Sequence, residues 1–500
     1  MKQVFIVPQF HCDVVWRRPP AEQTRIRAHQ YASALETLRR EPAFRFEFDQ
    51  ARLVREFLDA HPRWLEPMRR LVREGRLEIT GGGETIPDTN MPCGEGLIRN
   101  LLLGRIWFEE TLGAAPIVAN MDDAFGMSGQ LPQIFRQFGY RWFRNSRMPG
   151  LDQEATRRGL IWQGLDGSRI FSGPVHGNVE LVTHVCNLPV IYRPAEFARH
   201  SLEQAFAGDR PVTYWQYCSE EDLVDGDIVR MILARVRRRG ADARFGLARE
   251  ALAAMERRGG RVPVVAGEFN PCLTGCYVTR IGVKQGYRAA EQGTLAAEAA
   301  AACAALDGAA YPRARLLAAW RSLAFIQFHD ALCGCHTREV NRAVLRACGQ
   351  TVRAAGGMAA AAVRALSPRR GRRPGVVLFN PLPWPRREAV PLDVPAGFVP
   401  AAPDGTRLPA ERHGAVTCAV VDLPPMGCLR LPLRRGSAPR PRSRARAAGR
   451  SFEVGPHRIV PRDDGLRIER RDWNRVLADG PFPEVRFRNE DGTQIGRAHV

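Results

Sequence analysis

The feature that most limits what this chain can fold into is an alternation over residues 1–270 of short apolar runs and amphipathic segments. The apolar runs have the length and residue types of buried strands, and they lie at Val4–Val7, Phe44–Phe48, Leu77–Thr80, Ile117–Met121, Val212–Tyr217 and Val262–Ala266. Between them, segments such as Ala51–Leu58 and Leu97–Glu110 have helical spacing. This pattern predicts βα units and a mainly parallel sheet.

Polar loops follow the predicted strands, at Gln9–Trp16, Gly81–Asp88, Asp122–Gly129 and Ser219–Asp225. In α/β folds, ligands bind where parallel strands end at their carboxyl side. We therefore look for chemistry in these four loops.

The remainder of the chain differs in character. Long Ala-rich helices are predicted at Lys284–Leu306, Ala314–Phe328 and Val340–Leu366. A Pro/Arg linker, Ser367–Arg373, then leads into short strands typical of a β-sandwich, in which Arg434–Arg450 is expected to be a loop. We expect a catalytic domain at residues 1–270, a helical middle domain at 271–366 and a β-sandwich at 374–500 that is cut short at its C-terminus.

Composition excludes several classes of protein. With 45% hydrophobic and 25% charged residues, the chain is globular rather than disordered. It has no run of about 20 apolar residues, so no membrane span is expected. The apolar run at the N-terminus is too short for a signal peptide, which predicts a cytoplasmic protein. Its 12 cysteines include no CxxC pair, and we expect reduced thiols.

The net charge of +20 invites a nucleic-acid interpretation. All but two of the 73 basic residues are arginine, however, and they are spread along the chain without interleaved aromatic residues. This usage is typical of a GC-rich genome rather than of a phosphate-binding surface. We therefore expect no nucleic-acid partner.

Three loops carry residues suited to metal binding. His11 and Asp13, two apart at a strand end, point to the same side and can share a cation such as zinc. Asp122 and Asp123 repel each other unless a cation lies between them. His329 follows the apolar helix that ends at Phe328. Each has a structural alternative: a capped turn with a packed histidine, a helix N-cap, and a helix C-cap.

In their order and spacing, these loops resemble glycoside hydrolase family 38, the zinc-dependent retaining α-mannosidases. The HxDxxW loop of that family is matched by His11, Asp13 and Trp16. Its DxFG loop with a following Leu-Pro is matched by Asp123, Phe125, Gly126, Leu131 and Pro132. Its His-Asp pair ahead of a glycine is matched by His329, Asp330 and Gly334. The resemblance extends from about Val4 to Pro383.

The resemblance implies a (β/α)7-type barrel, then a three-helix bundle domain and a β-sandwich. It also implies one zinc ion, or another divalent ion, held by His11, Asp13, Asp123 and His329. The metal would grip two mannose hydroxyls, and Asp123 would attack the anomeric carbon. Trp16 would stack on the sugar and Asp330 would bind a sugar hydroxyl.

The second carboxyl group that a retaining glycosidase needs departs from the family pattern. The family has an aspartate in a short turn after a strand, whereas this chain has Ser219-Glu220-Glu221-Asp222. Glu221 is our first candidate for the acid/base and Glu220 is the second, against the alternative of a solvated acidic loop. Arg144 and Arg147 are further candidates to reach a sugar hydroxyl.

The sequence therefore predicts a cytoplasmic α-mannosidase that removes terminal α-linked mannose from glycans or oligosaccharides by a retaining, metal-assisted double displacement. Two alternatives stay open. One is another metal-dependent carbohydrate hydrolase, such as a deacetylase, and the other is a sugar-binding relative impaired in its Glu220–Asp222 loop. The expected partner is a mannose-containing glycan, with no membrane, and a homo-oligomer is compatible with the sequence.

Overall fold

The computed structural model divides into two compact units, Met1–Leu366 and Ser367–Val500. It describes the following residues: 2–144, 146–151, 158–174, 179–182, 211–219, 223–224, 226–240, 242–258, 260–270, 272–367, 374–414, 416–437, 445–448, 451–454, 456–462, 465–470, 475–480, 484–488 and 494–499. Each unit is described by itself below.

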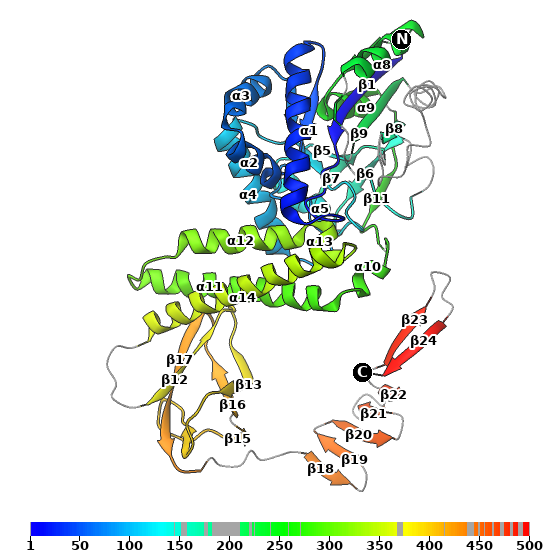
Figure 1. The fold of residues 1–500 in the computed structure, drawn as a ribbon. Coiled ribbons are helices and arrows are strands. Elements are labelled where there is room, and N and C mark those ends of the chain that lie inside the picture. The colour runs from blue at the N-terminus through cyan, green and yellow to red at the C-terminus, as the bar shows by residue number, and fades with distance from the viewer. Residues whose placement is uncertain are drawn as a thin grey trace. The chain divides into compact units, whose positions relative to one another are not determined.

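The first unit contains two sheets (Figure 1). One has the strand order β3-β2-β1-β9-β8, with β10 also paired to β1, and all of its pairs are parallel. Its strands are β1 Gln3–Phe10, β2 Phe46–Phe48, β3 Leu77–Ile79, β8 Val179–Val182, β9 Val212–Ser219 and β10 Asp242–Phe245. β1 is buried from Val4 onward, as expected of a strand inside a parallel sheet.

The other sheet has the order β11-β6-β7-β5-β4. Its strands are β4 Val118–Asn120, β5 Trp142–Arg144, β6 Leu160–Gln163, β7 Arg169–Ser172 and β11 Val264–Ala266. Among its described pairs only β6–β7 is antiparallel. The prediction of a mainly parallel α/β region is therefore confirmed.

Helices α1 Pro20–Arg40, α2 Ala51–Ala60, α3 Leu65–Arg73, α4 Gly94–Leu112, α5 Leu131–Gln137, α8 Gly226–Arg238 and α9 Ala248–Arg258 pack around these strands, with a short 3-10 turn, η1 Pro62–Trp64. Local chemistry sets the ends of α4. The Cys93 thiol accepts a hydrogen bond from the Gly96 amide, and Gly113 ends the helix in the left-handed conformation that glycine favours.

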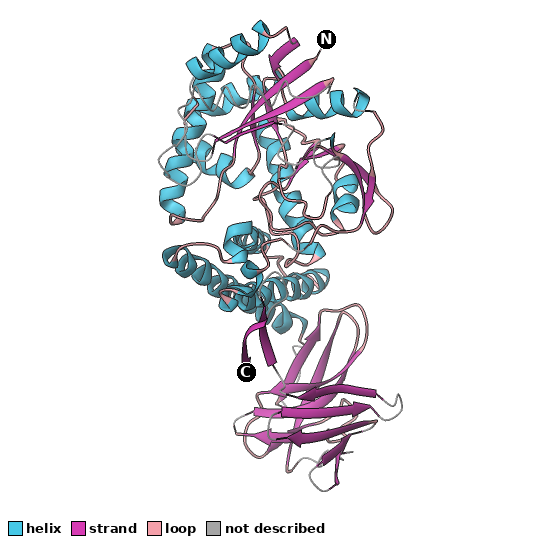
Figure 2. Cartoon of the chain, turned by 90° about the vertical axis from the view of Figure 1, so that its right-hand side faces the viewer, coloured by secondary structure: helices cyan, strands magenta, loops and turns pink. Residues whose placement is uncertain are grey.

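The described part of the first unit also contains the helices α10 Gly275–Val278, α11 Ile281–Leu306, α12 Arg313–Gln327, α13 His329–Cys333 and α14 Arg338–Leu366. Figures 1 and 2 show α11, α12 and α14 side by side as a layer of their own. The helical region is therefore confirmed, with boundaries within three residues of those predicted.

The break between α12 and α13 positions a residue of interest. Phe328 has φ −46° and ψ 134°, which ends α12, and the chain restarts as a helix at His329. The break is held by the loop after β3, because the Asp88 amide donates to the Gln327 carbonyl at 2.7 Å and the His329 amide donates to the Ile86 carbonyl at 3.2 Å. The alternative of His329 as a C-cap is wrong: it begins a helix.

The second unit is β-rich. Its first strands pair as β12-β17-β14 and β13-β16-β15, and they are β12 Gly375–Asn380, β13 Arg386–Leu392, β14 Phe398–Pro400, β15 Ala410–His413, β16 Val416–Leu423 and β17 Gly427–Arg435. Then follow β18 Ala445–Ala448, β19 Ser451–Val454, β20 His457–Arg462, β21 Gly465–Arg470, β22 Arg475–Gly480, β23 Glu484–Arg488 and β24 Gln494–His499.

One prediction for this unit is wrong. Arg434–Arg450 was expected to be a loop, but β17 continues through Arg435 and Ala445–Ala448 forms β18 against β19.

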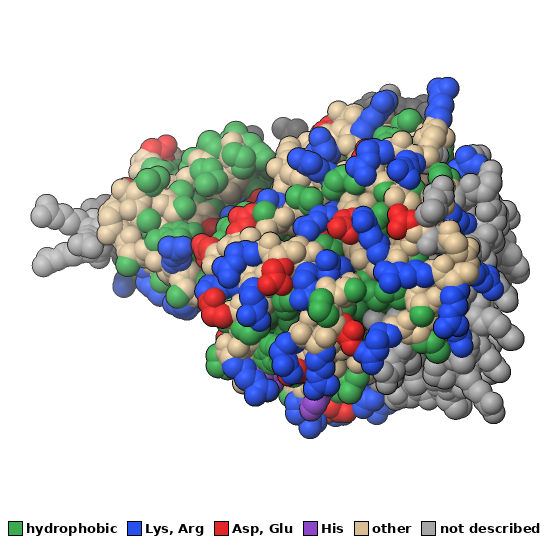
Figure 3. Space-filling view, turned by 90° about the horizontal axis from the view of Figure 1, so that it is seen from above, with side chains coloured by type: hydrophobic (Ala, Val, Ile, Leu, Met, Phe, Trp, Pro, Cys, Tyr) green, Lys and Arg blue, Asp and Glu red, His purple; other side chains and the backbone are tan. Residues whose placement is uncertain are grey.

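The face of the molecule in Figure 3 carries many arginine side chains, mixed with acidic and hydrophobic ones. Among the helices that the structure describes, none has both the length and the apolar character needed to cross a membrane.

Candidate functional site

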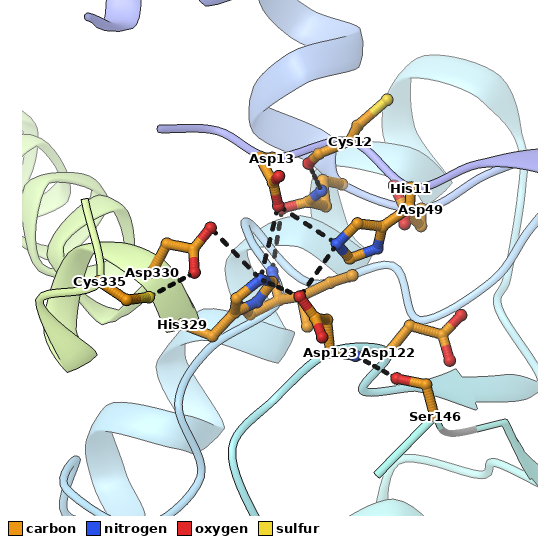
Figure 4. Close-up of polar contacts among 12 residues, drawn as sticks. His11, Cys12, Asp13, Asp49, Asp122, Asp123, Ser146, His329, Asp330 and Cys335 are labelled. Carbon is orange, nitrogen blue, oxygen red and sulfur yellow. Dashed lines mark hydrogen bonds and ion pairs between the residues drawn. The ribbon is translucent and has the colours of Figure 1, made fainter. Parts of the chain in front are cut away.

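Three chain segments that are far apart in sequence converge at one point of the first unit (Figure 4). The loop after β1 carries His11 and Asp13, the loop after β4 carries Asp123, and the start of α13 carries His329. The two loops lie at the carboxyl ends of parallel strands, where the sequence pattern placed them. The helix break at Phe328 brings the fourth residue to the same point.

The polar atoms of these four residues face one another. His11 Nε2 lies 3.2 Å from Asp13 Oδ1 and 3.6 Å from Asp123 Oδ2. His329 Nε2 lies 3.6 Å from Asp13 Oδ1 and 3.8 Å from Asp123 Oδ2. Each imidazole thus faces both carboxylates. Ligand atoms of His11, Asp13 and His329 also lie within 4.8 Å of one another, a spacing that allows them to share one metal ion.

Burial makes this arrangement costly unless a cation is bound. The His329 side chain is fully buried, and that of Asp13 is 6% exposed. Among the described residues, His11 Nε2, His329 Nε2 and Asp13 Oδ1 are buried without a hydrogen-bond partner. Buried polar atoms normally have partners, so three such atoms aimed at one point call for a bound group. Two imidazole nitrogens with carboxylate oxygens suit zinc, and the residues fit a divalent metal ion.

The tautomer of His329 is fixed for metal binding. Its Nδ1 lies 3.2 Å from the Ile86 carbonyl oxygen, which can only accept a hydrogen bond. Nδ1 therefore carries the proton, and the lone pair of Nε2 is directed toward Asp13 and Asp123. The rings of Phe328 and Phe125, 4.1 and 5.9 Å from the His329 ring, hold it in place.

The electrostatics of the cluster follow from burial and close opposite charges. Burial opposes ionisation of His11, but the carboxylates of Asp13 and Asp123 outweigh it and raise the pKa of His11 well above 6.5. The pKa of His329 is raised, because burial is again outweighed by nearby carboxylates, Asp330 first. The pKa of Asp123 falls to about 2, since the two imidazoles and Arg147 overcome the effect of its burial.

Asp123 sits in an unusual turn. Its φ is +63°, a left-handed conformation that aspartate tolerates better than most residues. The Asp123 amide donates to Ser146 Oγ at 2.5 Å, and Arg147 Nε donates to Asp123 Oδ1 at 2.5 Å. Oδ1 is thereby held by Arg147, while Oδ2 faces the two imidazoles. At 30% exposed, the Asp123 side chain is the most accessible of the four.

The structure separates the two carboxylates of the Asp122–Asp123 pair. The sequence left open whether they share a cation or cap a helix, and in the structure they face different groups. Asp122 Oδ2 lies 3.1 Å from Arg144 Nε, in a buried ion pair, whereas Asp123 faces Arg147 and the imidazoles. Arg144 and Arg147 are thus engaged with protein carboxylates, a pairing across more than 20 residues that spacing along the sequence did not reveal.

The remaining predicted site residues lie at different distances from the cluster. Asp330 is buried, and its Oδ2 is 4.0 Å from His329 Nε2 while Oδ1 accepts from the Cys335 thiol at 2.8 Å. Burial and the nearby Asp13 carboxylate raise the pKa of Asp330 to about 8. Trp16 is half-buried, with the Arg17 guanidinium 5.4 Å from its ring. These contacts do not test the sugar-binding roles that the sequence predicted for Asp330 and Trp16.

Glu220, Glu221 and Asp222 lie outside the described residues. The backbone of β9 is described up to Ser219, which pairs with Phe10 at the end of β1. The last described residue of β9 thus lies beside the residue that precedes His11.

The chain was compared with known proteins. The family model of the glycosyl hydrolases family 38 N-terminal domain matches residues 1–208, and that of the alpha mannosidase middle domain matches residues 272–366. Human alpha-mannosidase 2C1 is 28% identical over 411 residues, covering 77% of this chain and 37% of the relative. Mouse alpha-mannosidase 2C1 is 27% identical over 403 residues, with the same coverage.

The fold agrees with a solved structure. The crystal structure of an alpha-mannosidase from Enterococcus faecalis V583 matches with a TM-score of 0.79 at 19% identity, over 95% of this chain and 61% of that chain. The chain spans less than two fifths of the length of the mammalian relatives. The two family models agree with each other. The first covers the region with the His11 and Asp123 loops, and the second covers the helices that carry His329. Residues 1–208 of the chain form a glycoside hydrolase family 38 N-terminal domain, followed by an alpha mannosidase middle domain at residues 272–366.

Proposed function

We propose that this chain carries the catalytic site of an α-mannosidase that releases terminal α-linked mannose from glycans or oligosaccharides with retention of configuration. The observation that carries the proposal is the convergence of His11, Asp13, Asp123 and His329, with three buried ligand atoms that lack a hydrogen-bond partner in the described part of the chain. The names of the mammalian and bacterial relatives support the same activity.

In this proposal the four residues hold one zinc ion, which would grip two adjacent hydroxyls of the sugar and orient its ring. His329 is preset for this by its bond to the Ile86 carbonyl, and Asp13 faces both imidazoles from within the core. Asp330 and Trp16 then bind a sugar hydroxyl and the apolar face of the sugar, respectively.

Asp123 acts as the nucleophile. It is ionised at neutral pH because its pKa is about 2, and it is the most accessible carboxylate of the cluster. Its Oδ1, paired with Arg147, and its Oδ2, facing the imidazoles, have distinct surroundings, so that the carboxylate has one defined orientation. Attack on the anomeric carbon forms a glycosyl ester with Asp123 and expels the leaving alcohol.

The second carboxyl group is assigned to Glu221, or failing that to Glu220. It protonates the leaving oxygen and later removes a proton from the incoming water. The pairing of Ser219, which precedes Glu220, with Phe10, which precedes His11, supports this assignment.

The finer architecture belongs to the same proposal. The two sheets of the first unit are taken as the parts of a (β/α)7-type barrel, since the Gly81 amide after β3 donates to the Val118 carbonyl of β4 at 2.7 Å. Residues 271–366 are taken as a three-helix domain and residues 374–500 as a β-sandwich. A cytoplasmic location remains a prediction from the sequence.

The proposal is tested with an aryl α-mannoside. We expect hydrolysis by the purified chain, loss of activity with a chelator, and recovery with zinc. Glu221→Gln and Glu220→Gln are then compared, with Glu66→Gln on the exposed part of α3 as the matched control. If neither loop variant lowers the rate relative to the control, the acid/base assignment is wrong.

The nucleophile is tested by trapping. A fluorinated mannosyl fluoride should leave a covalent sugar on the peptide that contains Asp123, found by mass spectrometry. A hydrolase that uses a metal-bound water would release product without labelling the protein, and that result would refute the double displacement.

A further inference from the structure

Arg144 is a fully buried cation that contacts the residue before Asp123. It ends β5, where it pairs in register with Asn120 at the end of β4. Its side chain is 1% exposed. An arginine at such depth is rare unless it is paired, so its partners indicate what it is for.

Those partners come from β2 and from just after β3 and β4. Arg144 Nη1 donates to Glu47 Oε2 of β2 at 2.5 Å, and Nη2 donates to Thr80 Oγ1, just after β3, at 3.3 Å. Its Nε lies 3.1 Å from Asp122 Oδ2, just after β4. The planar guanidinium thus ties β2, β3 and the Asp122–Asp123 turn to one point, which a lysine could not do with the same geometry.

Arg144 is also the first of three residues on one short segment that each fix a different part of this turn. Arg144 pairs with the Asp122 carboxylate, Ser146 Oγ accepts from the Asp123 amide, and Arg147 holds Asp123 Oδ1. Arg144 and Ser146 are buried, whereas Arg147 is partly exposed. Since Asp123 has φ +63°, the turn is held in a conformation that its own backbone does not favour.

Charge balance makes Arg144 hard to replace. The buried carboxylates of Glu47, Asp49 and Asp122 all lie close enough to shift its pKa upward, against the effect of burial. Asp49 also accepts from Asn120 Nδ2 at 3.4 Å, and Asn120 Oδ1 accepts from the Asp122 amide at 2.9 Å. Without Arg144, the buried Asp122 carboxylate would lose this ion-pair partner, and the turn that it shares with Asp123 would shift.

We infer that Arg144 is a positioning residue for the nucleophile: through its ion pair with Asp122 it holds the Asp122–Asp123 turn so that Asp123 faces both imidazoles. This inference rests on the proposed function of Asp123. The Asp122–Arg144 pair thus acts on Asp123 through the turn, whereas Arg147 contacts the reacting carboxylate of Asp123 itself.

The test compares Arg144→Met, Asp122→Asn and the double variant in the full chain. Arg55→Met is the matched control, because it also removes an arginine from a buried carboxylate, Glu84, whose described contacts lie outside the Asp123 turn. Kinetics with an aryl α-mannoside, zinc affinity and thermal unfolding are measured for each. The comparison with Arg55→Met separates loss of positioning from loss of stability.

We expect Arg144→Met to lower kcat about 100-fold, as misplacement of a reacting group by about 1 Å does, with little change in KM. Asp122→Asn should lower kcat in the same direction with little change in unfolding temperature. Because the two residues act as a pair, the double variant should be no slower than Arg144→Met. The inference is overturned if kcat matches that of Arg55→Met, or if the two effects multiply.

The kcat of Asp122→Asn and the zinc affinity of the Arg144→Met variant give two further tests. If Arg144→Met does not fold, Asp122→Asn decides alone, and an unchanged kcat overturns the inference. If the wild-type chain does not hydrolyse the mannoside, the proposed function fails but the positioning of Asp123 can still be read from zinc affinity. Zinc affinity should then fall about 10–100-fold in Arg144→Met and not in Arg55→Met, as for other groups that orient metal ligands. Equal affinities would refute it.

Discussion

Protons and the metal ion compete for the same two imidazole nitrogens, and this competition sets how metal affinity depends on pH. Nε2 of both His11 and His329 faces the carboxylates of Asp13 and Asp123. Burial opposes the charged imidazoles, yet the carboxylates raise the pKa of His11 well above 6.5 and raise that of His329 as well. The metal-free site therefore keeps its protons to higher pH than free imidazoles do, and the ion must displace them.

The magnitude follows from the number of protons displaced. Each one changes the metal association constant tenfold per pH unit, or about 1.4 kcal/mol. At a pH below both raised pKa values, metal binding displaces two imidazole protons, so the metal affinity should rise about 100-fold with each pH unit. At a pH above both pKa values, the affinity should level off. The sign for stability is opposite in the metal-free protein. A histidine whose pKa is raised in the folded state stabilises the fold, and this stabilisation is complete below the unfolded-state pKa of about 6.5. The stabilisation is lost as the pH rises through the folded-state pKa.

Zinc affinity measured by competition with a fluorescent chelator between about pH 6 and 8 tests this. A plot of the logarithm of the association constant against pH should have a slope between one and two. His29→Gln, an exposed histidine on α1, serves as the control and should keep the wild-type slope. Thermal unfolding of the metal-free chain should show stability falling with pH over the same interval. A slope near zero would refute the account of the raised imidazole pKa values.

Three other predictions follow from the same structure. Asp123→Ala should abolish mannoside hydrolysis while the chain stays folded, and measurable turnover by this variant would rule out Asp123 as nucleophile. Gly104→Ala should destabilise the first unit by about 1–3 kcal/mol, because the added Cβ would come within 2.2–2.5 Å of backbone atoms of Gly82, Gly83 and Glu84; an unchanged denaturant midpoint would contradict this. Chelation should lower the unfolding temperature of the wild type and expose the α13 segment to hydrogen exchange, whereas a chelator-independent profile would count against metal binding across β1, β4 and α13.

Much of this fold could be predicted from the sequence because apolar periodicity reports burial directly. The run Val212–Tyr217 lies within β9, and Leu131–Phe138 corresponds to α5 within one residue. Helix α1, by contrast, was not predicted. Its buried face combines Tyr31, Leu35 and Leu38 with polar Gln23, Arg27 and Gln30, so its hydrophobic pattern is weak.

The site was predictable to the extent that its chemistry lies in local motifs. His11 with Asp13, and Asp123 with Phe125, are recognisable because ligands on one strand end must be close in sequence. The supporting contacts could not be predicted. Arg144 is one of many arginines in the chain, and its burial depends on three strand ends meeting. The carbonyl of Ile86, which fixes His329, leaves no mark in the sequence, because any residue supplies a backbone carbonyl.

The break at Phe328 has a consequence for the order of events during synthesis. The proposed metal ligand His11 is made near the very start of translation, whereas the proposed ligand His329 is made much later. A nascent chain that stops short of α13 has an incomplete set of ligands, however well its strands have paired. Under the proposed function, loading of the ion would thus be a late event that follows packing of α13 against the loops of β1 and β4.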